Sequence, residues 1–235
     1  MNNKFLKGLR DGIPIALGYL SVSFTFGIRA VNDGILWWEA MLISMTNLTS
    51  AGQFAGLTVI ASGGTLIEMA LTQLVINMRY ALMSLSLTQK LDGSFSRAKR
   101  WLAGYGVTDE IFAVASGSRD AVTAGYMAGL IITPVVGWTS GTVLGSIAGN
   151  ILPAAVQSAL SVAIYGMFIA IFVPPMKKNK AVAAVVVMGI VLSCCFEWVP
   201  VINRVSAGFA IIICAVIAAA VGAALFPIED KEVQQ

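Results

Sequence analysis

The sequence contains no histidine, and only 11% of its residues are charged, against about 25% in a typical soluble domain. The lack of histidine excludes Ser–His and Cys–His catalysis, the HExxH zinc motif and haem held by histidine. The three cysteines, Cys194, Cys195 and Cys214, lie inside apolar runs without metal-ligand spacing, so we interpret them as small apolar side chains. We therefore expect no enzyme activity, no metal and no cofactor.

Apolar residues dominate the chain instead. Hydrophobic residues make up 57% of the 235 positions, and the mean hydropathy is +0.83. Such a chain cannot cover its surface in water, whereas in a bilayer its apolar surface faces lipid. A spanning helix needs about 20 apolar residues, and the sequence offers about seven such stretches without the alternation typical of a membrane barrel. The predicted fold class is an all-α polytopic membrane protein with some broken or re-entrant segments.

The apolar segments can be read directly from the sequence. Segment 37–61 is interrupted near its middle at 49–53, and segment 121–149 has a predicted break at 134–137. Segment 101–118 is short and holds three glycines and two acids, which makes it the least regular. The segments lie at 12–30, 37–61, 65–87, 101–118, 121–149, 154–173, 181–199 and 205–226.

Basic residues predict the orientation. They cluster at 4–10, 90–100 and 177–180, and Lys and Arg concentrate on the cytoplasmic side of membrane proteins. If segment 37–61 crossed the membrane once, the second cluster would lie outside. If the segment entered and returned, all three clusters and the N-terminus would be cytoplasmic. The charge pattern therefore favours a re-entrant or broken hairpin at 50–53, and the alternative is an ordinary span with an exceptional loop.

The interruption is a candidate binding segment. In a membrane, irregular backbone is tolerated where it is buried in protein or lines a wet cavity, and the N-termini of half-helices attract anionic groups. The segment offers small residues, a hydroxyl and an amide. The alternative is a kink that serves packing only. The residues are Ser50, Ala51, Gly52 and Gln53.

The helix predicted at 65–87 is polar on two sides. One side carries Arg79, within about 40° of Glu68, and the opposite side carries Asn77. A helix of this kind is expected at the centre of a bundle. Arg79 is a candidate functional residue, with snorkelling to the headgroups as the alternative, and Glu68 is expected at the membrane interface.

Two adjacent acids begin the next apolar run. Asp109 and Glu110 follow Thr108, and such residues are typical of a capped helix N-terminus. In a chain without histidine they are also candidates for binding an amine and, together with Glu197, the main candidates for proton coupling. Glu197, beside Trp198, is expected at the interface.

Glycines recur at every fourth position late in segment 121–149. This spacing lets two helices approach closely, so it predicts a packing face for another helix of the chain or for a partner subunit. The residues are Gly137, Gly141, Gly145 and Gly149.

Several motifs, taken together, resemble the AzlC-like family, the large subunit of branched-chain amino-acid exporters. The resemblance spans 8–175, whereas 176–228, an expected C-terminal helix pair of the single transporter domain 1–235, carries little of it. The family often has His where this chain has Tyr80, so a titrating imidazole is not available there. The motifs are Gly12-x-Pro14-Ile15-x-x-Gly18-Tyr19, Phe24-x-Phe26-Gly27, Ser44, Ser50-Ala51-Gly52-Gln53-Phe54, Asn77-x-Arg79-Tyr80-x-Leu82, Thr108-Asp109-Glu110-x-Phe112 and Trp138-x-x-Gly141-Thr142-x-Leu144-Gly145.

The resemblance implies export of leucine, isoleucine and valine, with methionine as a further candidate, and a small hydrophobic AzlD-like membrane partner. Our hypothesis places the substrate carboxylate at 50–53 and Arg79, and its ammonium at Asp109, Glu110 or Asn77. Phe54 is expected among the apolar walls, and Tyr80 belongs to the same candidate site. Alternatives are a channel or importer for another small solute, or a non-transporting membrane scaffold. No nucleic-acid partner is expected.

Overall fold

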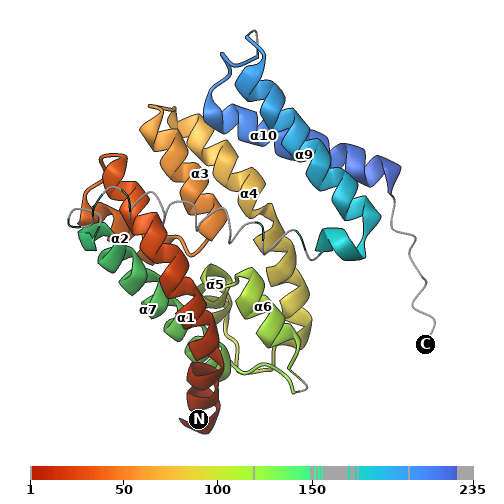
Figure 1. Cartoon of the computed structure of the whole chain (residues 1–235). Helices are drawn as coiled ribbons and strands as arrows, with labels where there is room; N and C mark the ends of the chain where they lie inside the picture. The colour runs from red at the N-terminus through yellow and green to blue at the C-terminus, as the bar shows by residue number, and fades with distance from the viewer. Residues whose placement is uncertain are drawn as a thin grey trace. The chain divides into compact units, whose positions relative to one another are not determined.

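The computed structural model describes residues 2–118, 120–148, 151, 153, 155, 169, 173, 175–200 and 202–226. Figure 1 shows their helices, and the predicted all-α membrane fold is confirmed. Four of these helices are long and apolar enough to cross a membrane: α1, α7, α9 and α10. The elements are α1 (Asn2–Asn32), α2 (Trp37–Thr46), α3 (Ser50–Ala61), α4 (Leu66–Leu87), η1 (Thr88–Lys90), α5 (Arg97–Tyr105), α6 (Asp109–Ser116), α7 (Ala124–Ala148), α9 (Lys180–Trp198) and α10 (Ala207–Leu225).

The chain divides into two compact units. Unit 1 comprises Met1–Leu57 with Asn77–Ile164, and unit 2 comprises Thr58–Ile76 with Tyr165–Gln235. Helices α3 and α4 run through the boundaries between them. Most of the predicted span at 154–173 lies outside the described residues, as do the polar tail at 229–235 and Gly149.

Helices α1 and α7 form a parallel pair in unit 1. Gly129 lies against the backbone of Phe5 near the start of α1, and Gly145 lies against Phe24 nearer its end. A Cβ on Gly145 would be 1.8 Å from the Phe24 carbonyl oxygen, so only glycine fits there. Gly137 and Gly141 also face the backbone of α1. The predicted glycine face therefore lies against another helix of the same chain.

Helix α7 continues through Pro134, so the predicted break at 134–137 is wrong. Proline is tolerated inside membrane helices where neighbouring groups compensate for the lost hydrogen bond. Here Gly12 of α1 leaves room for the ring, since a Cβ on Gly12 would be 3.1 Å from Pro134 Cδ. The first helix is also longer than the predicted 12–30, because its basic N-terminal stretch is helical from Asn2 onward.

Helices α2 and α3 form an antiparallel hairpin, here called hairpin A. Gln53 Nε2 donates to Ser44 Oγ at 3.2 Å across the hairpin, and Ala40 shares a core cluster with Leu57 further from the tip. The segment thus folds back on itself, as a re-entrant segment requires. Its tip is Asn47–Thr49 rather than the predicted 50–53, because Thr49 accepts the backbone hydrogen bond of Gln53 and Ser50 already begins α3.

Helices α5 and α6 form a second hairpin, here called hairpin B. Its two ends lie at the loop after α4, where Lys99 Nζ donates to the Ser94 carbonyl and Lys90 Nζ to the Ser118 carbonyl, both at 3.0 Å. Its tip is the turn 106–108, where Gly106 lies against Ile131 of α7. Segment 101–118 is therefore two short helices and not a span.

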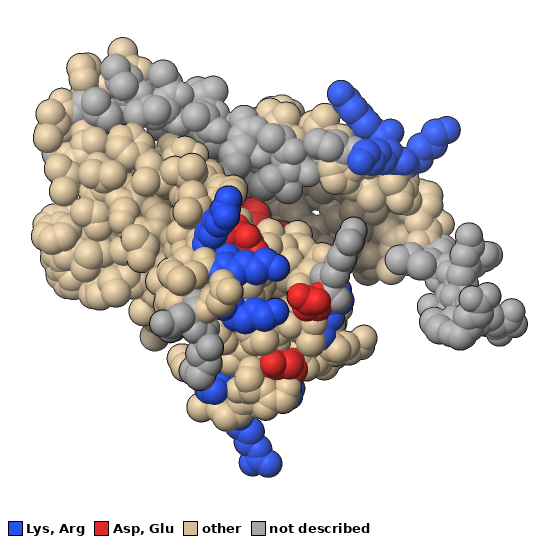
Figure 2. Space-filling view, turned by 90° about the horizontal axis from the view of Figure 1, so that it is seen from below, with Lys and Arg blue, Asp and Glu red and all other residues tan. Residues whose placement is uncertain are grey.

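One end of unit 1 carries the first two basic clusters, and we call it the basic end. Lys4 lies 3.6 Å from Asp120, just before α7. The loop after α4 reaches the same place, because Asp92 N donates to the Val122 carbonyl at 3.0 Å. Figure 2 views the molecule from the side where α1 begins, and Lys and Arg side chains gather there. Hairpin B therefore enters from the basic end, and hairpin A enters from the opposite end, where α1 finishes.

Unit 2 contains the antiparallel helices α9 and α10 together with the first half of α4. Gly222 of α10 lies against Val185 of α9. Glu68 is 2% exposed, and its carboxylate accepts hydrogen bonds from Gly208 N at 2.8 Å and Ser206 Oγ at 2.5 Å. The reason is that the free N–H groups at the start of α10 need an acceptor, and a carboxylate is favourable at a helix N-terminus.

Candidate functional site

The tips of hairpins A and B meet near the middle of α1 and α7. The Tyr105 hydroxyl, at the tip of hairpin B, donates to the Met45 carbonyl, near the tip of hairpin A. Hairpin A is bonded to Trp138 of α7, and hairpin B is bonded to Tyr19 of α1. Two interrupted segments that enter from opposite ends therefore converge at one place in unit 1, and most of the candidate residues lie around it.

The buried side of this place is a hydrogen-bonded network. Trp138 Nε1 donates to Gln53 Oε1 at 2.7 Å, while Gln53 Nε2 donates to Ser44 Oγ at 3.2 Å. The Ser44 hydroxyl lies 2.7 Å from the Thr142 hydroxyl, which also donates to the Trp138 carbonyl at 3.1 Å. All four side chains are buried. Buried polar groups are costly when unpaired, so this network fixes hairpin A on α7.

Tyr19 links the buried network to the charged residues. Its ring lies 5.2 Å from the Trp138 ring at 79°, an edge-to-face contact. Its hydroxyl lies 2.7 Å from Thr108 Oγ1 and 2.5 Å from Glu110 Oε2. A hydroxyl has one proton, and an ionised carboxylate can only accept, so Tyr19 donates to Glu110 and accepts from Thr108.

An ion pair lies on the accessible side. Arg79 Nη1 is 2.9 Å from Asp109 Oδ2, and the two side chains are 42% and 41% exposed. Arg79 Nη2 also donates to the Tyr80 hydroxyl at 2.9 Å, and the guanidinium lies 4.8 Å from the centre of the Tyr80 ring. A cation and an anion therefore lie side by side, each partly exposed.

The N-termini of α3 and α6 add to the electrostatic potential between the two hairpin tips. Asp109 and Glu110 occupy the first turn of α6, capped by Thr108, whose Oγ1 accepts from Ile111 N at 3.3 Å. The first turn of α3 begins at the other tip, after Thr49. Helix N-termini carry a partial positive charge, so both half-helices favour an anionic group between the tips.

A cavity of about 570 Å³ opens beside the ion pair, between α4 and α5. Tyr80 belongs both to its lining and to the Arg79 contacts. This volume lies within the range of small-molecule sites, about 300–1,000 Å³. The other lining residues are Ala81, Ser84, Arg100, Trp101, Gly104 and Tyr105.

The predicted site residues do not all lie at this place. Gln53, Arg79, Tyr80, Asp109 and Glu110 surround the two tips, and Ser50, Ala51 and Gly52 form the first turn of α3.

Phe54 and Asn77 point elsewhere. The Phe54 ring packs against Phe26 at 5.4 Å in an apolar cluster. Asn77 precedes Arg79 by two residues, so the two side chains leave α4 about 160° apart.

Five residues of this arrangement were not predicted as site residues: Tyr19, Ser44, Thr108, Trp138 and Thr142. Each belongs to a motif that carries the family resemblance, and this was the available signal. Composition alone could not find them, because single Tyr, Trp, Ser and Thr residues in apolar helices more often serve packing.

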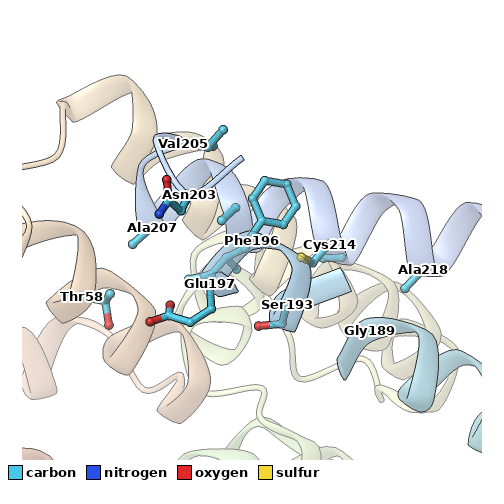
Figure 3. A pocket seen from close by; sticks show the side chains of 13 residues that line it. Thr58, Gly189, Ser193, Phe196, Glu197, Asn203, Val205, Ala207, Cys214 and Ala218 are labelled. Atoms are coloured by element: carbon cyan, nitrogen blue, oxygen red, sulfur yellow. The ribbon is translucent and has the colours of Figure 1, made fainter. Parts of the chain in front are cut away.

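Unit 2 has a cavity of its own, of about 800 Å³. Figure 3 shows Glu197 directed toward Thr58, and Ser193 and Gly189 of α9 and Ala218 of α10 also line the cavity. Glu197 lies in the last turn of α9 and is exposed, in keeping with the expected position near a helix end. None of the residues predicted for the binding site lines this cavity.

Comparison with known proteins gives the family. A model described as AzlC protein matches residues 14–152. An uncharacterized membrane protein of Archaeoglobus fulgidus is 34% identical over 77% of this chain and 80% of its own length. The inner membrane protein YgaZ of Escherichia coli is 27% identical over 75% of each chain. No solved structure gives a significant match. The chain is therefore a membrane protein that belongs to the AzlC family.

Proposed function

We propose that this chain is the large subunit of a secondary transporter that exports branched-chain amino acids across the cytoplasmic membrane. Leucine, isoleucine and valine are the main substrates, and methionine is a further one. The N-terminus and the basic end of unit 1 face the cytoplasm, in line with the positive-inside rule. The observation that carries the proposal is the accessible Arg79–Asp109 pair at the meeting point of two re-entrant hairpins.

A zwitterion needs one partner of each charge. Ionised groups are costly inside a membrane, so a site that takes an amino acid must supply both partners. Arg79 can accept the carboxylate in a two-pronged contact, assisted by the N-termini of α3 and α6. Asp109 then binds the ammonium group. In the empty protein the two residues neutralise each other, and the substrate replaces one ion pair by two.

The cavity between α4 and α5 suits an apolar side chain. Tyr80, Trp101 and Tyr105 supply aromatic lining, which takes up branched apolar groups without demanding a hydrogen bond. We assign the side-chain pocket to these three residues in place of Phe54. The cavity also adjoins the hairpin that enters from the basic end, so an exporter would be loaded there from the cytoplasm.

Proton coupling is assigned to the two acids of α6. Glu110 accepts from Tyr19, and Asp109 pairs with Arg79, so the two carboxylates have different partners 2.5 Å and 2.9 Å away. Protonation of either acid would weaken its contact and change the charge of the site. A small hydrophobic membrane subunit of the AzlD-like type is the proposed partner.

The test is counterflow of radiolabelled leucine in proteoliposomes, with this chain alone and with the candidate partner. We expect saturable exchange that valine competes for and glutamate does not. Arg79→Gln and Asp109→Asn should each lower exchange at least about tenfold, since each leaves one substrate charge unpaired.

Arg29→Gln is the matched control, because Arg29 forms a comparable exposed ion pair with Asp33 at 2.7 Å, away from the site. Its exchange should stay near that of the unmodified protein. Flux that does not saturate would point to a channel. Full exchange in both site variants would refute the assigned site, and absence of exchange by the folded protein with its partner would favour a scaffold.

A further inference from the structure

Two successive parts of the chain have the same plan in opposite orientation. Helix α1 is followed by hairpin A, and helix α4 is followed by hairpin B. In unit 1, α1 runs away from the basic end and the second half of α4 runs toward it, because Leu87 leads into the loop bonded to Val122. Each hairpin enters from the end at which its preceding helix finishes. This is the geometry of an inverted-topology repeat, a common plan of secondary transporters.

The sequence carries a matching pattern. Tyr19 lies 30 residues before Thr49, and Tyr80 lies 28 residues before Thr108. An apolar residue, Leu48 or Val107, directly precedes each threonine. Each threonine is the last residue before the second short helix of its hairpin, α3 or α6. The dipeptide Phe-Ala follows in both hairpins, at 54–55 and 112–113.

The corresponding residues are engaged differently. Tyr19 contacts the tip threonine of the other repeat, Thr108, at 2.7 Å. The Tyr80 hydroxyl instead accepts from Arg79, and Thr49 Oγ1 donates to Asn47 in its own hairpin tip. The structure therefore has one tyrosine–threonine contact between the repeats, on the side of hairpin B, and lacks the corresponding contact on the side of hairpin A.

We propose that Tyr80 and Thr49 form this second contact in another conformation of the protein, in which the Tyr19–Thr108 contact is broken. Both tyrosines are then positioning residues, each holding the opposite hairpin tip in one of two conformations. In the described conformation the cavity between α4 and α5 is open. In the second conformation Tyr80, part of its lining, turns toward hairpin A, and the cavity closes.

This inference deepens the proposed function, on which it rests for the need to open the site to each side in turn. It also assigns a role to the hydroxyl of Thr49.

The test measures how readily the cavity can be reached, without any substrate. A single reporter, Ser84→Cys, is placed in the cavity lining of a chain whose three cysteines are serine, and a maleimide is applied from the cytoplasmic side. Thr108→Ala removes the tyrosine–threonine contact of the described conformation and leaves the Tyr19–Glu110 contact in place, so labelling should slow by about threefold or more. Thr49→Ala removes the contact of the second conformation, so labelling should become faster.

Conservative variants separate positioning from general damage. Thr49→Ser and Thr108→Ser keep the hydroxyl and should restore the labelling rate of the reporter protein. Changes in the same direction for both alanine variants would overturn the inference, because a purely structural loss has no reason to act with opposite signs.

A cross-linking experiment tests the second conformation directly. Tyr80→Cys with Thr49→Cys should be joined by a short bifunctional thiol reagent in the chain whose three cysteines are serine. Tyr80→Cys with Thr46→Cys is the control and should not be joined. Thr46 is the last residue of α2, three positions before Thr49. If Tyr19→Cys with Thr108→Cys is joined but Tyr80→Cys with Thr49→Cys is not, the inference is wrong even if the protein exports leucine.

Discussion

At the scale of single residues, the site depends on side chains that combine an apolar body with one polar atom. Tyr19 packs its ring on Trp138 and places its hydroxyl between Thr108 and Glu110. Such residues can lie deep in a membrane protein at little cost while they hold a carboxylate in place. Their contributions to packing and to function can be separated by removing the polar atom alone.

Tyr19→Phe should keep the fold and impair transport. The ring contact with Trp138 remains, but Glu110 loses its donor, so we expect leucine counterflow to fall several-fold with little change in thermal stability. Tyr126→Phe is the matched control, since the Tyr126 hydroxyl also donates to a carboxylate, that of Asp11 at 2.8 Å, away from the hairpin tips. Equal losses in the two variants would mean that Tyr19 has no special role.

Gln53→Leu should lower stability more than it alters substrate preference. It leaves the indole N–H of Trp138 without its acceptor in a buried position, at a cost of about 1–3 kcal/mol. The midpoint of thermal unfolding of the purified protein should fall accordingly. An unchanged midpoint would show that water or another group replaces the amide.

At the scale of elements, the two short hairpins are held by different means. Hairpin A is fixed by buried hydrogen bonds to α7, and hairpin B by the contact of its tip with Tyr19 and by the loop at the basic end. The pair α1 and α7 depends on neither, because glycines bring its backbones into direct contact.

Gly145→Ala should destabilise the protein, since the added Cβ would lie 1.8 Å from the Phe24 carbonyl oxygen. Overpacking of this kind typically costs about 1–3 kcal/mol. Gly125→Ala, in the same helix, is the control, because no atom lies within 4 Å of the added carbon. It should be neutral or slightly stabilising in a thermal unfolding assay, and an equal loss in both variants would contradict the contact.

The loop at the basic end should be insensitive to mild acid. The Ser94 hydroxyl, followed by the Ser94 backbone N–H, lowers the pKa of Asp92. A lowered pKa in the folded state means that the ionised carboxylate stabilises the loop at neutral pH, and that this contribution is lost only as the pH falls through the lowered pKa. Hydrogen exchange of residues 90–96, corrected for its intrinsic rate, should therefore stay constant down to about pH 5 and rise in stronger acid.

Asp92→Asn should raise this exchange already at neutral pH and remove the acid-dependent rise. An unchanged acid response in the variant would assign the dependence to another group.

At the scale of the whole molecule, charge and hairpins together determine the topology. The first two basic clusters lie at the same end of unit 1, as a re-entrant segment between them requires. The positive-inside rule predicts that this end faces the cytoplasm.

A single cysteine at position 96, at the start of α5, should be labelled by an impermeant reagent from the cytoplasmic side only. A single cysteine at position 36, before α2, should be labelled from the outside only. Labelling of both positions from one side would show that segment 37–61 or the helices around it cross differently from the proposed topology.

Much of the fold could be predicted from the sequence. Apolar length located the long helices, and the placement of Lys and Arg predicted that segment 37–61 enters and returns. The exact tip could not be predicted, because Ser50–Gln53 suits a helix start as well as a break, and the choice depends on the capping position of Thr49. Pro134 was misleading for a related reason, since its tolerance depends on Gly12 in a distant part of the sequence.

The charged residues of the candidate site could be predicted from the sequence, but the hydrogen bonds and ring contacts that link them could not. Arg79, Asp109 and Glu110 stood out because ionised residues are rare in apolar segments. Tyr19 and Trp138 did not, because their importance comes from lying between two hairpin tips that are about 60 residues apart in sequence. Residue type and spacing carry no information about such convergence.

The glycine contacts between α1 and α7 also determine which part of the protein can move. Where a glycine of one helix lies against the backbone of the other, a shift of one residue would place a side chain where only hydrogen fits. These two helices should therefore move together as one rigid body. Access to the site would then change through the elements packed against α1 and α7. The amide hydrogens of α1 and α7 should be the last in unit 1 to exchange.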